Sequence, residues 1–198
     1  PERDLAIMFN ASRLAGREAI ATLEERGLVE RRVGAKGGTF ILPIAKSIEN
    51  EMKQNLKDKY EEVTSLLEFR SIIEPHATKL SAERISQEAL LEFERLIESC
   101  EGDVDREMFR SIDVKIHLLI AKESGNEFFY QSVRDIRTRI NVGFHLMEFN
   151  YKVKEKTNQY HKNIFHAMKN RDANRAHQLM FDHIHETEVA LLNIINRT

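Results

Sequence analysis

Asp113 and His117 are the first pair in the sequence whose types and spacing could do chemistry. They are four residues apart, so on a helix their side chains point in nearly the same direction. The pair lies within an apolar stripe made of Phe109, Ile112, Ile116 and Ile120. An acid on a buried face is costly unless it is paired or bound to a cation. The alternative for this pair alone is a capping carboxylate beside a hydrogen-bonded core histidine.

Two further histidines favour a metal site over that alternative. His161 shares a helical face with Ile164, Phe165 and Met168, and His183 shares one with Leu179 and Met180. Three histidines and one aspartate on the inward faces of three helices are typical of a metal site in a helical bundle. The donor set suits zinc first, and also nickel, manganese or iron. Unconnected core histidines are the competing interpretation.

The glycines and prolines predict how the chain divides. Five of the eight glycines and two of the three prolines fall within the first 43 residues. We therefore expect a short, turn-rich domain at 1–43, a linker or leading helix at 44–57, and an all-helical domain at 58–198. Helices are expected at 58–83, 86–101, 104–123, 126–150, 152–170 and 173–196, with Ser86 and Asp103 as helix caps.

The first domain has the element order of a winged helix-turn-helix. A helix over residues 2–9 and a turn precede Ser12, which is a good N-cap for a second helix over 13–26. On that helix Arg13 and Arg17 share an exposed face, from which they can reach guanine edges and phosphates in a major groove. Two strands, 28–33 and 39–42, would form the wing. The alternative is a small helix-hairpin unit with ordinary surface arginines.

Composition excludes several classes of protein. The 198 residues carry a formal net charge of -2, are 41% hydrophobic and 31% charged, and contain no long apolar run. A transmembrane span is therefore not expected. The single cysteine, Cys100, excludes an internal disulfide framework and a cysteine-based zinc finger, and it suits a reducing cytoplasm. Near-neutral charge argues against a protein coated in nucleic acid, although a small basic face fits within the average.

The first domain resembles the DNA-binding domain of the GntR family of bacterial transcription regulators. The resemblance rests on Pro1-Glu2-Arg3-Asp4-Leu5-Ala6, on Ser12-Arg13-x-x-x-Arg17-Glu18-Ala19-Ile20, on Gly27-Leu28-Val29 and on Gly38-Thr39. It implies that Arg3, Ser12, Arg13, Arg17 and the wing tip from Lys36 to Gly38 contact operator DNA. The family has one more helix before the point at which this sequence begins, so the winged domain is expected to be partial, with its first helix missing.

The second domain resembles the FCD-type effector-binding domain of the FadR subfamily. The matching motifs are Leu67-Glu68-Phe69-Arg70-x-x-x-Glu74-Pro75, Asp113-x-x-x-His117-x-x-x-Ala121-x-x-x-Gly125-Asn126, and His161-x-x-Ile164 with His183. The resemblance implies that Asp113, His117, His161 and His183 hold a divalent metal whose open positions accept a small carboxylate effector. Arg70 is the candidate partner of that carboxylate, and a surface salt bridge to Glu74 is its alternative. Arg137 is a weaker candidate.

These features predict a transcription regulator and not an enzyme. A small organic acid bound at the metal site would change the placement of two winged domains in a homodimer on operator DNA. One alternative is a regulator that senses the metal itself, without an organic effector. Another is a metal-dependent hydrolase or lyase, because three histidines, one aspartate and an open position could activate water. No spare inward carboxylate or histidine is evident as a general base for such an enzyme.

Overall fold

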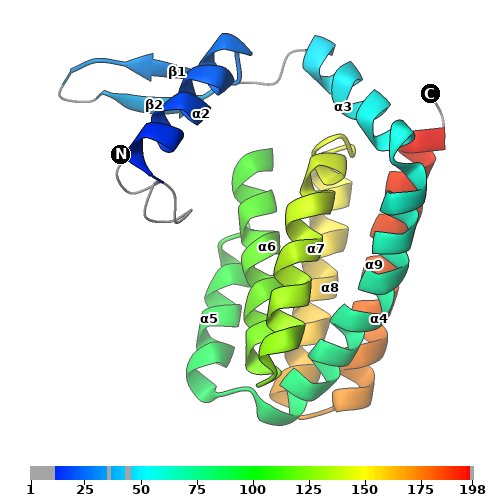
Figure 1. The fold of residues 1–198 in the computed structure, drawn as a ribbon. Helices are drawn as coiled ribbons and strands as arrows, with labels where there is room; N and C mark the ends of the chain where they lie inside the picture. Colours follow the sequence, from blue (N-terminus) through cyan, green and yellow to red (C-terminus); the bar gives the residue numbers. More distant parts are fainter. Residues whose placement is uncertain (1–11, 35–36, 43–45, 197–198) are drawn as a thin grey trace. The chain divides into compact units, whose positions relative to one another are not determined.

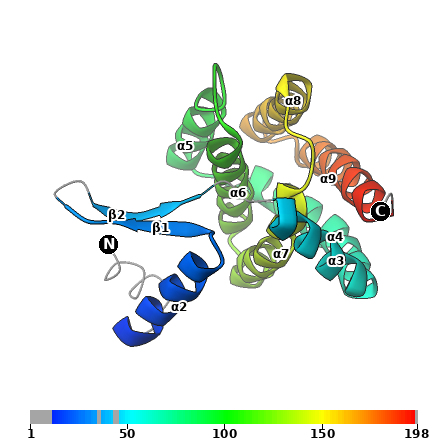
Figure 2. The same cartoon turned by 90° about the horizontal axis from the view of Figure 1, so that it is seen from above.

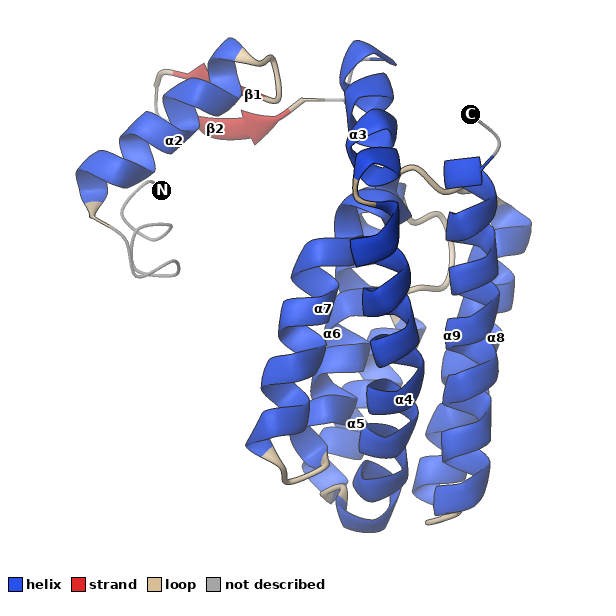
Figure 3. Ribbon diagram, turned by 45° about the vertical axis from the view of Figure 1, so that its right-hand side comes forward, coloured by secondary structure: helices blue, strands red, loops and turns tan. Residues whose placement is uncertain are grey.

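The computed structural model describes residues 12–34, 37–42 and 46–196 and divides the chain into two compact units, 1–52 and 53–198. Long helices and one small two-stranded sheet make up the described residues (Figure 3). The predicted fold class, mainly α with a helical bundle, is confirmed. The two units are considered separately below.

The first unit contains one described helix and a hairpin. Helix α2 spans Arg13–Glu25 and begins where the Ser12 hydroxyl accepts a hydrogen bond from the Ala15 amide at 3.1 Å, as predicted. Strands β1 (Val29–Arg32) and β2 (Gly38–Ile41) pair antiparallel, with Val29 opposite Ile41. The predicted helix over 2–9, Arg3 and Lys36 lie outside the described residues.

Helices make up the second unit. They are α4 (Tyr60–Arg84), α5 (Gln87–Glu98), α6 (Arg106–Glu123), α7 (Glu127–His145), α8 (Tyr151–Lys169) and α9 (Ala173–Asn196), preceded by α3 (Lys46–Asp58), which joins the two units. Helices α4 to α9 run side by side as a bundle (Figures 1 and 2), and α4 packs most extensively on α9. The segment expected as a linker or leading helix is thus helical from Lys46 onward.

Side-chain caps set several helix starts. Ser86 caps α5 as predicted, by accepting a hydrogen bond from the Ala89 amide. The prediction for Asp103 is wrong, because Asp105 accepts the hydrogen bond of the Met108 amide and starts α6 two residues later. The predicted helix 126–150 ends earlier, at His145, because the Asn150 side chain caps the next helix.

Two hydrophobic clusters hold the bundle together. The first joins α5, α6, α8 and α9 through buried residues such as Phe93, Ile116, Ile164 and Met180. The second joins α3, α4, α7 and α9 through residues such as Leu67, Ile140 and Leu191. Because α6, α8 and α9 are packed by the first cluster, side chains that they direct inward are fixed relative to one another. No helix of the described residues is long and apolar enough to cross a membrane.

Candidate metal centre

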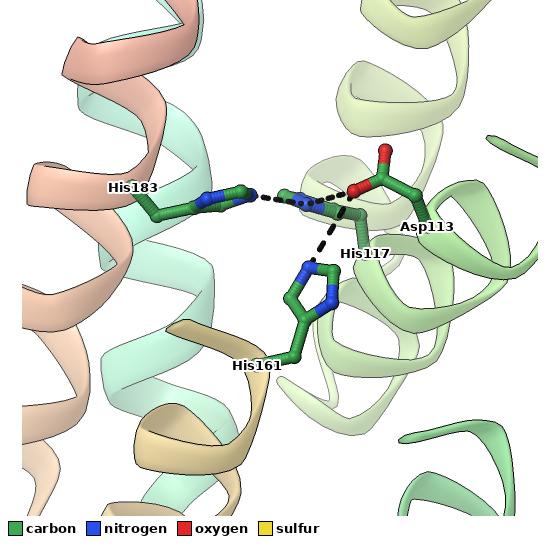
Figure 4. Close-up of side chains that lie close together, drawn as sticks. All are labelled: Asp113, His117, His161 and His183. Atoms are coloured by element: carbon green, nitrogen blue, oxygen red, sulfur yellow. Dashed lines mark hydrogen bonds and ion pairs between the residues drawn. The ribbon is translucent and has the colours of Figure 1, made fainter. Parts of the chain in front are cut away.

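The structure brings together the four side chains that the sequence singled out. Asp113 and His117 come from α6, His161 from α8 and His183 from α9, and all four are buried (Figure 4). One ligand atom from each lies within 4.8 Å of the others. The separations are 3.3 Å from His117 Nε2 to His183 Nε2, and 3.5 Å and 3.7 Å from Asp113 Oδ1 to the Nε2 atoms of His161 and His117. Ligand atoms bonded at about 2.1 Å to one ion lie no more than about 4.2 Å apart, so these three separations fit a shared ion.

The imidazole of His161 provides a second indication that the cluster suits a metal. It is fully buried, yet neither of its ring nitrogens has a hydrogen-bond partner among the described residues. A buried polar atom without a partner costs free energy, and such atoms are rare in native structures. A cation at the centre of the cluster would satisfy Nε2, so the residues present fit a divalent metal.

Glu74 of α4 fixes the tautomer of His117. Its Oε2 contacts Nδ1 of His117, the nitrogen opposite the Nε2 that faces the cluster. A carboxylate only accepts hydrogen bonds, so Nδ1 carries the proton and a neutral His117 presents an unprotonated Nε2 to the cluster. This carboxylate-histidine arrangement is the usual support of a metal-binding imidazole. Sequence reasoning missed this role, although Glu74 lies in the same motif as Arg70.

Arg70 occupies a different environment from either of those expected. Its Nε donates to Glu74 Oε1 at 2.7 Å and its Nη1 donates to Thr187 Oγ1 at 3.2 Å. The predicted partner Glu74 is correct, but the pair is buried, with Arg70 only 1% exposed, and not at the helix surface. Burial opposes ionisation of Glu74, and the charge of Arg70 outweighs it, so the pKa of Glu74 lies far below its usual value. Both oxygens of this inward carboxylate are therefore engaged, by Arg70 and by His117.

Arg137 of α7 binds the metal-facing aspartate directly. One of its guanidinium nitrogens, Nη2, donates to Asp113 Oδ2, which leaves Oδ1 directed at the imidazoles. Burial alone would raise the pKa of Asp113, but the neighbouring charge of Arg137 outweighs it and holds that pKa well below the usual range. Asp113 is thus an anion in the folded chain, as a metal ligand must be.

Two histidines of the cluster, His161 and His183, are neutral for the opposite reason. Burial lowers the pKa of His161 to about 4, against an ordinary value of 6.5, and the attraction of Asp113 only partly compensates. Burial, together with the neighbouring His161 and His117, also places the pKa of His183 well below 6.5. Unprotonated imidazoles are the form that coordinates metals.

The remaining histidines lie outside the cluster. His166 and His185 are exposed, while His177 is half-buried. The ring of His76 meets that of His177 edge-on, with ring centroids 5.0 Å apart. That contact joins α4 to α9 and was not apparent from the sequence, because 101 positions separate the two residues.

A pocket of about 890 Å³ borders the cluster at His183. We call it the His183 pocket; it is lined by Lys53, Arg110, Leu146, Met147, Glu148, Val153, Lys156, Thr157, Tyr160, His183, His185, Glu186, Thr187, Val189, Ala190, Asn193 and Ile194. Such a volume accommodates a small organic molecule. Neither predicted effector-binding arginine, Arg70 or Arg137, is among the described residues that line it. Sequence reasoning did not identify Arg110, although it lies three residues before Asp113 on the same face of α6.

The predicted DNA-contacting residues that the structure describes all belong to the first unit. Arg13 and Arg17 are exposed near the start of α2, Ser12 is its cap, and Gly38 is exposed at the start of β2. An N-terminal helical turn that carries two exposed arginines can present them to a major groove.

Comparison with known proteins matches residues 65–186 to the FCD domain model. The chain belongs to the FCD domain family. Two relatives of the whole chain are named as regulators. HTH-type transcriptional regulator YcbG of Bacillus subtilis (strain 168) is 26% identical over 92% of this chain and 76% of its own length. The Uxu operon transcriptional regulator of Escherichia coli (strain K12) is 28% identical over 99% of this chain and 79% of its own.

Solved structures agree with this assignment. Streptococcus agalactiae GntR superimposes with a TM-score of 0.56 and 26% identity, covering 94% of this chain and 86% of that one. The metal-free FCD domain of TM0439 has the same fold, with a TM-score of 0.59 at 24% identity over 69% of this chain and 95% of that one. The resemblance to GntR-type regulators with an FCD domain is confirmed, and the chain is a transcriptional regulator of that type.

Proposed function

We propose that this FCD protein is a DNA-binding regulator whose affinity for operator DNA is controlled by a small organic acid bound at a divalent-metal site. The observation that carries the proposal is the buried group of Asp113, His117, His161 and His183, which borders the His183 pocket. The four side chains would hold the ion, and zinc is the first candidate, followed by nickel, manganese and iron. Such an ion supplies positive charge and open coordination positions for an acid.

DNA binding is assigned to residues 1–43 and effector binding to residues 58–198. Arg13 and Arg17 would contact the duplex, with Ser12 and Gly38 beside them, and so would Arg3 and Lys36. A homodimer would place two such units on one operator. The acid must bind the DNA-competent and DNA-incompetent arrangements of that dimer with different affinity, since otherwise it shifts no equilibrium.

A catalytic role is not proposed. Hydrolysis at such a centre would need a free general base, and the one inward carboxylate near the cluster besides Asp113, that of Glu74, has both oxygens engaged. The named relatives are transcriptional regulators, and the proposed function is transcription regulation in the cytoplasm, without enzymatic activity.

Elemental analysis of purified variants tests the metal site. Asp113→Ala and His183→Ala should lose the ion while circular dichroism stays largely helical, because each removes one of four ligands and leaves the apolar clusters intact. His185→Ala, an exposed position on the same helix, is the matched control and should retain the metal. Full metal occupancy in both ligand variants would refute the site.

DNA binding can be tested with duplexes that the metal-loaded chain selects from a random pool. Arg13→Ala and Arg17→Ala should weaken binding to the selected duplex and reduce its salt dependence, because each variant removes a cation that displaces counterions from DNA. Metal-dependent binding that no organic acid changes would favour the alternative of a metal-sensing regulator.

A further inference from the structure

Arg110 carries buried donors with no partner. Its Nε and Nη2 are shielded from solvent, and neither has a hydrogen-bond partner among the described residues. The arginine one turn earlier is satisfied, since Arg106 Nη1 donates to the carbonyl oxygen of His145 at 2.7 Å. Arg70 is likewise paired, with Glu74. Leaving a charged donor buried and unpaired is costly, so such a group indicates a missing anion.

The pocket's own acids are engaged elsewhere. Glu186 pairs with Lys156 at 2.8 Å, and Glu148 accepts a hydrogen bond from the Asn150 side chain. Both acids line the His183 pocket, as Arg110 does. Among the described residues no acid forms an ion pair with Arg110, and Asp113, whose charge acts on it, is bound to Arg137. An anion from outside the chain is therefore the natural partner.

The unpartnered atoms form one edge of the guanidinium. Nε and Nη2 present two nearly parallel N–H bonds, the geometry that binds both oxygens of a carboxylate. Arg110 precedes Asp113 by three residues on α6, about 4.5 Å along the helix axis. Arg110 and His183 line the same pocket, so a small molecule bound there lies within reach of both the guanidinium and the metal cluster.

We propose that Arg110 binds a carboxylate of the pocket's ligand, and that this ligand is an organic acid with a second oxygen group directed at the metal. The inference rests on the proposed function and sharpens it. It replaces Arg70 and Arg137 as the residues that recognise the acid, because both pair with carboxylates of the protein itself and neither is among the described residues that line the pocket. The ligand class is then a dicarboxylate or another acid with two separated oxygen groups.

Calorimetric titration of the zinc-loaded full chain with succinate and butyrate tests the proposal. The two acids have the same carbon chain length, and succinate has a carboxylate where butyrate has a methyl group. The wild type should bind succinate about ten- to a hundredfold more tightly, the range of a charge-assisted hydrogen-bonded pair. Arg110→Gln should remove this advantage and leave butyrate affinity and zinc content unchanged. Arg134→Gln, an exposed arginine on α7, should behave as the wild type.

Each outcome separates this inference from the proposed function. If Arg110→Gln retains zinc and keeps the succinate preference, Arg110 is not the recognition residue, while the metal site stands. If the zinc-loaded wild type binds neither acid, both the inference and the organic-acid effector fail. If the wild type holds no zinc but Arg110→Gln still abolishes succinate binding, the role of Arg110 survives, while the metal site and the oxygen group directed at it do not. Arg110→Lys keeps the charge but loses the pair of parallel N–H donors. Its preference for succinate over butyrate should lie between those of the wild type and Arg110→Gln.

Discussion

The carboxylate of Glu74 contacts His117 at Nδ1, on the far side of the ring from the metal cluster, while its other oxygen accepts from Arg70. One acid on α4 therefore joins a buried arginine to a candidate metal ligand on α6. The contact sets the proton of the imidazole on Nδ1 and holds the ring in place. We therefore expect metal affinity to depend on a residue that is not itself a candidate ligand.

Replacing Glu74 tests this dependence. Glu74→Gln should lower zinc affinity about 10- to 100-fold, because the amide no longer enforces the Nδ1 proton of His117. Competition with a fluorescent chelator measures the affinity. Glu62→Gln, which alters an exposed salt bridge to Arg139, is the control and should change nothing. Equal zinc affinity in the wild type and Glu74→Gln would show that Glu74 has only a packing role.

Metal removal should make stability sensitive to acid. In the folded, metal-free chain the pKa of His161 is lowered to about 4, and in the unfolded chain it returns to 6.5. Between these values the unfolded chain binds a proton that the folded chain does not, so the free energy of unfolding falls as pH decreases from 6.5 towards 4. One such group contributes at most about 1.4 kcal/mol per pH unit.

Urea unfolding in the presence of a chelator, repeated from pH 7 to pH 4.5, measures that slope. His161→Leu should reduce it, because the variant has no imidazole to protonate at this position. His166→Gln, on the exposed side of the same helix, should leave the slope as in the wild type. An unchanged slope in His161→Leu would contradict the prediction.

Arg137 should control the pH at which metal is released. Its charge lowers the pKa of Asp113 against the opposing effect of burial, and Arg137→Met removes that charge. The pKa of Asp113 should then rise, so protons compete with the metal at higher pH. Titration of bound zinc from pH 8 to pH 4 should show half-release shifted upward in Arg137→Met. The exposed variant Arg139→Met provides the baseline, and coincident curves would exclude this role.

Gly16 should limit the stability of helix α2. It is the fourth residue of α2, and a Cβ built there meets no atom within 4 Å. Gly16→Ala should therefore stabilise α2 by about 0.5–1 kcal/mol through the lower entropy of the unfolded chain. Amide hydrogen exchange of α2 measures the change.

Gly27→Ala is the control, and it should destabilise the end of α2 where Gly16→Ala stabilises the helix. A Cβ there also meets nothing within 4 Å, but its φ of 67° lies in the left-handed region that ends the helix. Gly27→Ala should accelerate exchange at the end of α2, because alanine is strained in that conformation. Slower exchange in Gly27→Ala, or faster exchange in Gly16→Ala, would contradict the argument.

The local pattern of the sequence was enough to predict the helices and the inward direction of the four candidate ligands. Spacings of three and four place Asp113 and His117 on the apolar face of one helix, and His161 and His183 on the apolar faces of two others. Helix starts were less certain, because Asp103 and Asp105 are chemically equivalent caps. In the structure Asp105 starts α6, three residues after Gly102, whose φ is positive.

Tertiary packing decides which arginines pair with a carboxylate of the protein and which do not. Arg70, Arg137 and Arg110 look alike as isolated arginines in amphipathic helices. Packing of α4 on α6 and of α6 on α7 places carboxylates against the first two, and the pocket bordered by α8 and α9 leaves the edge of Arg110 without one. Periodicity reports the direction of a side chain from its own helix. The identity of the group that it meets depends on how separate helices pack, and that relationship is not local in the sequence.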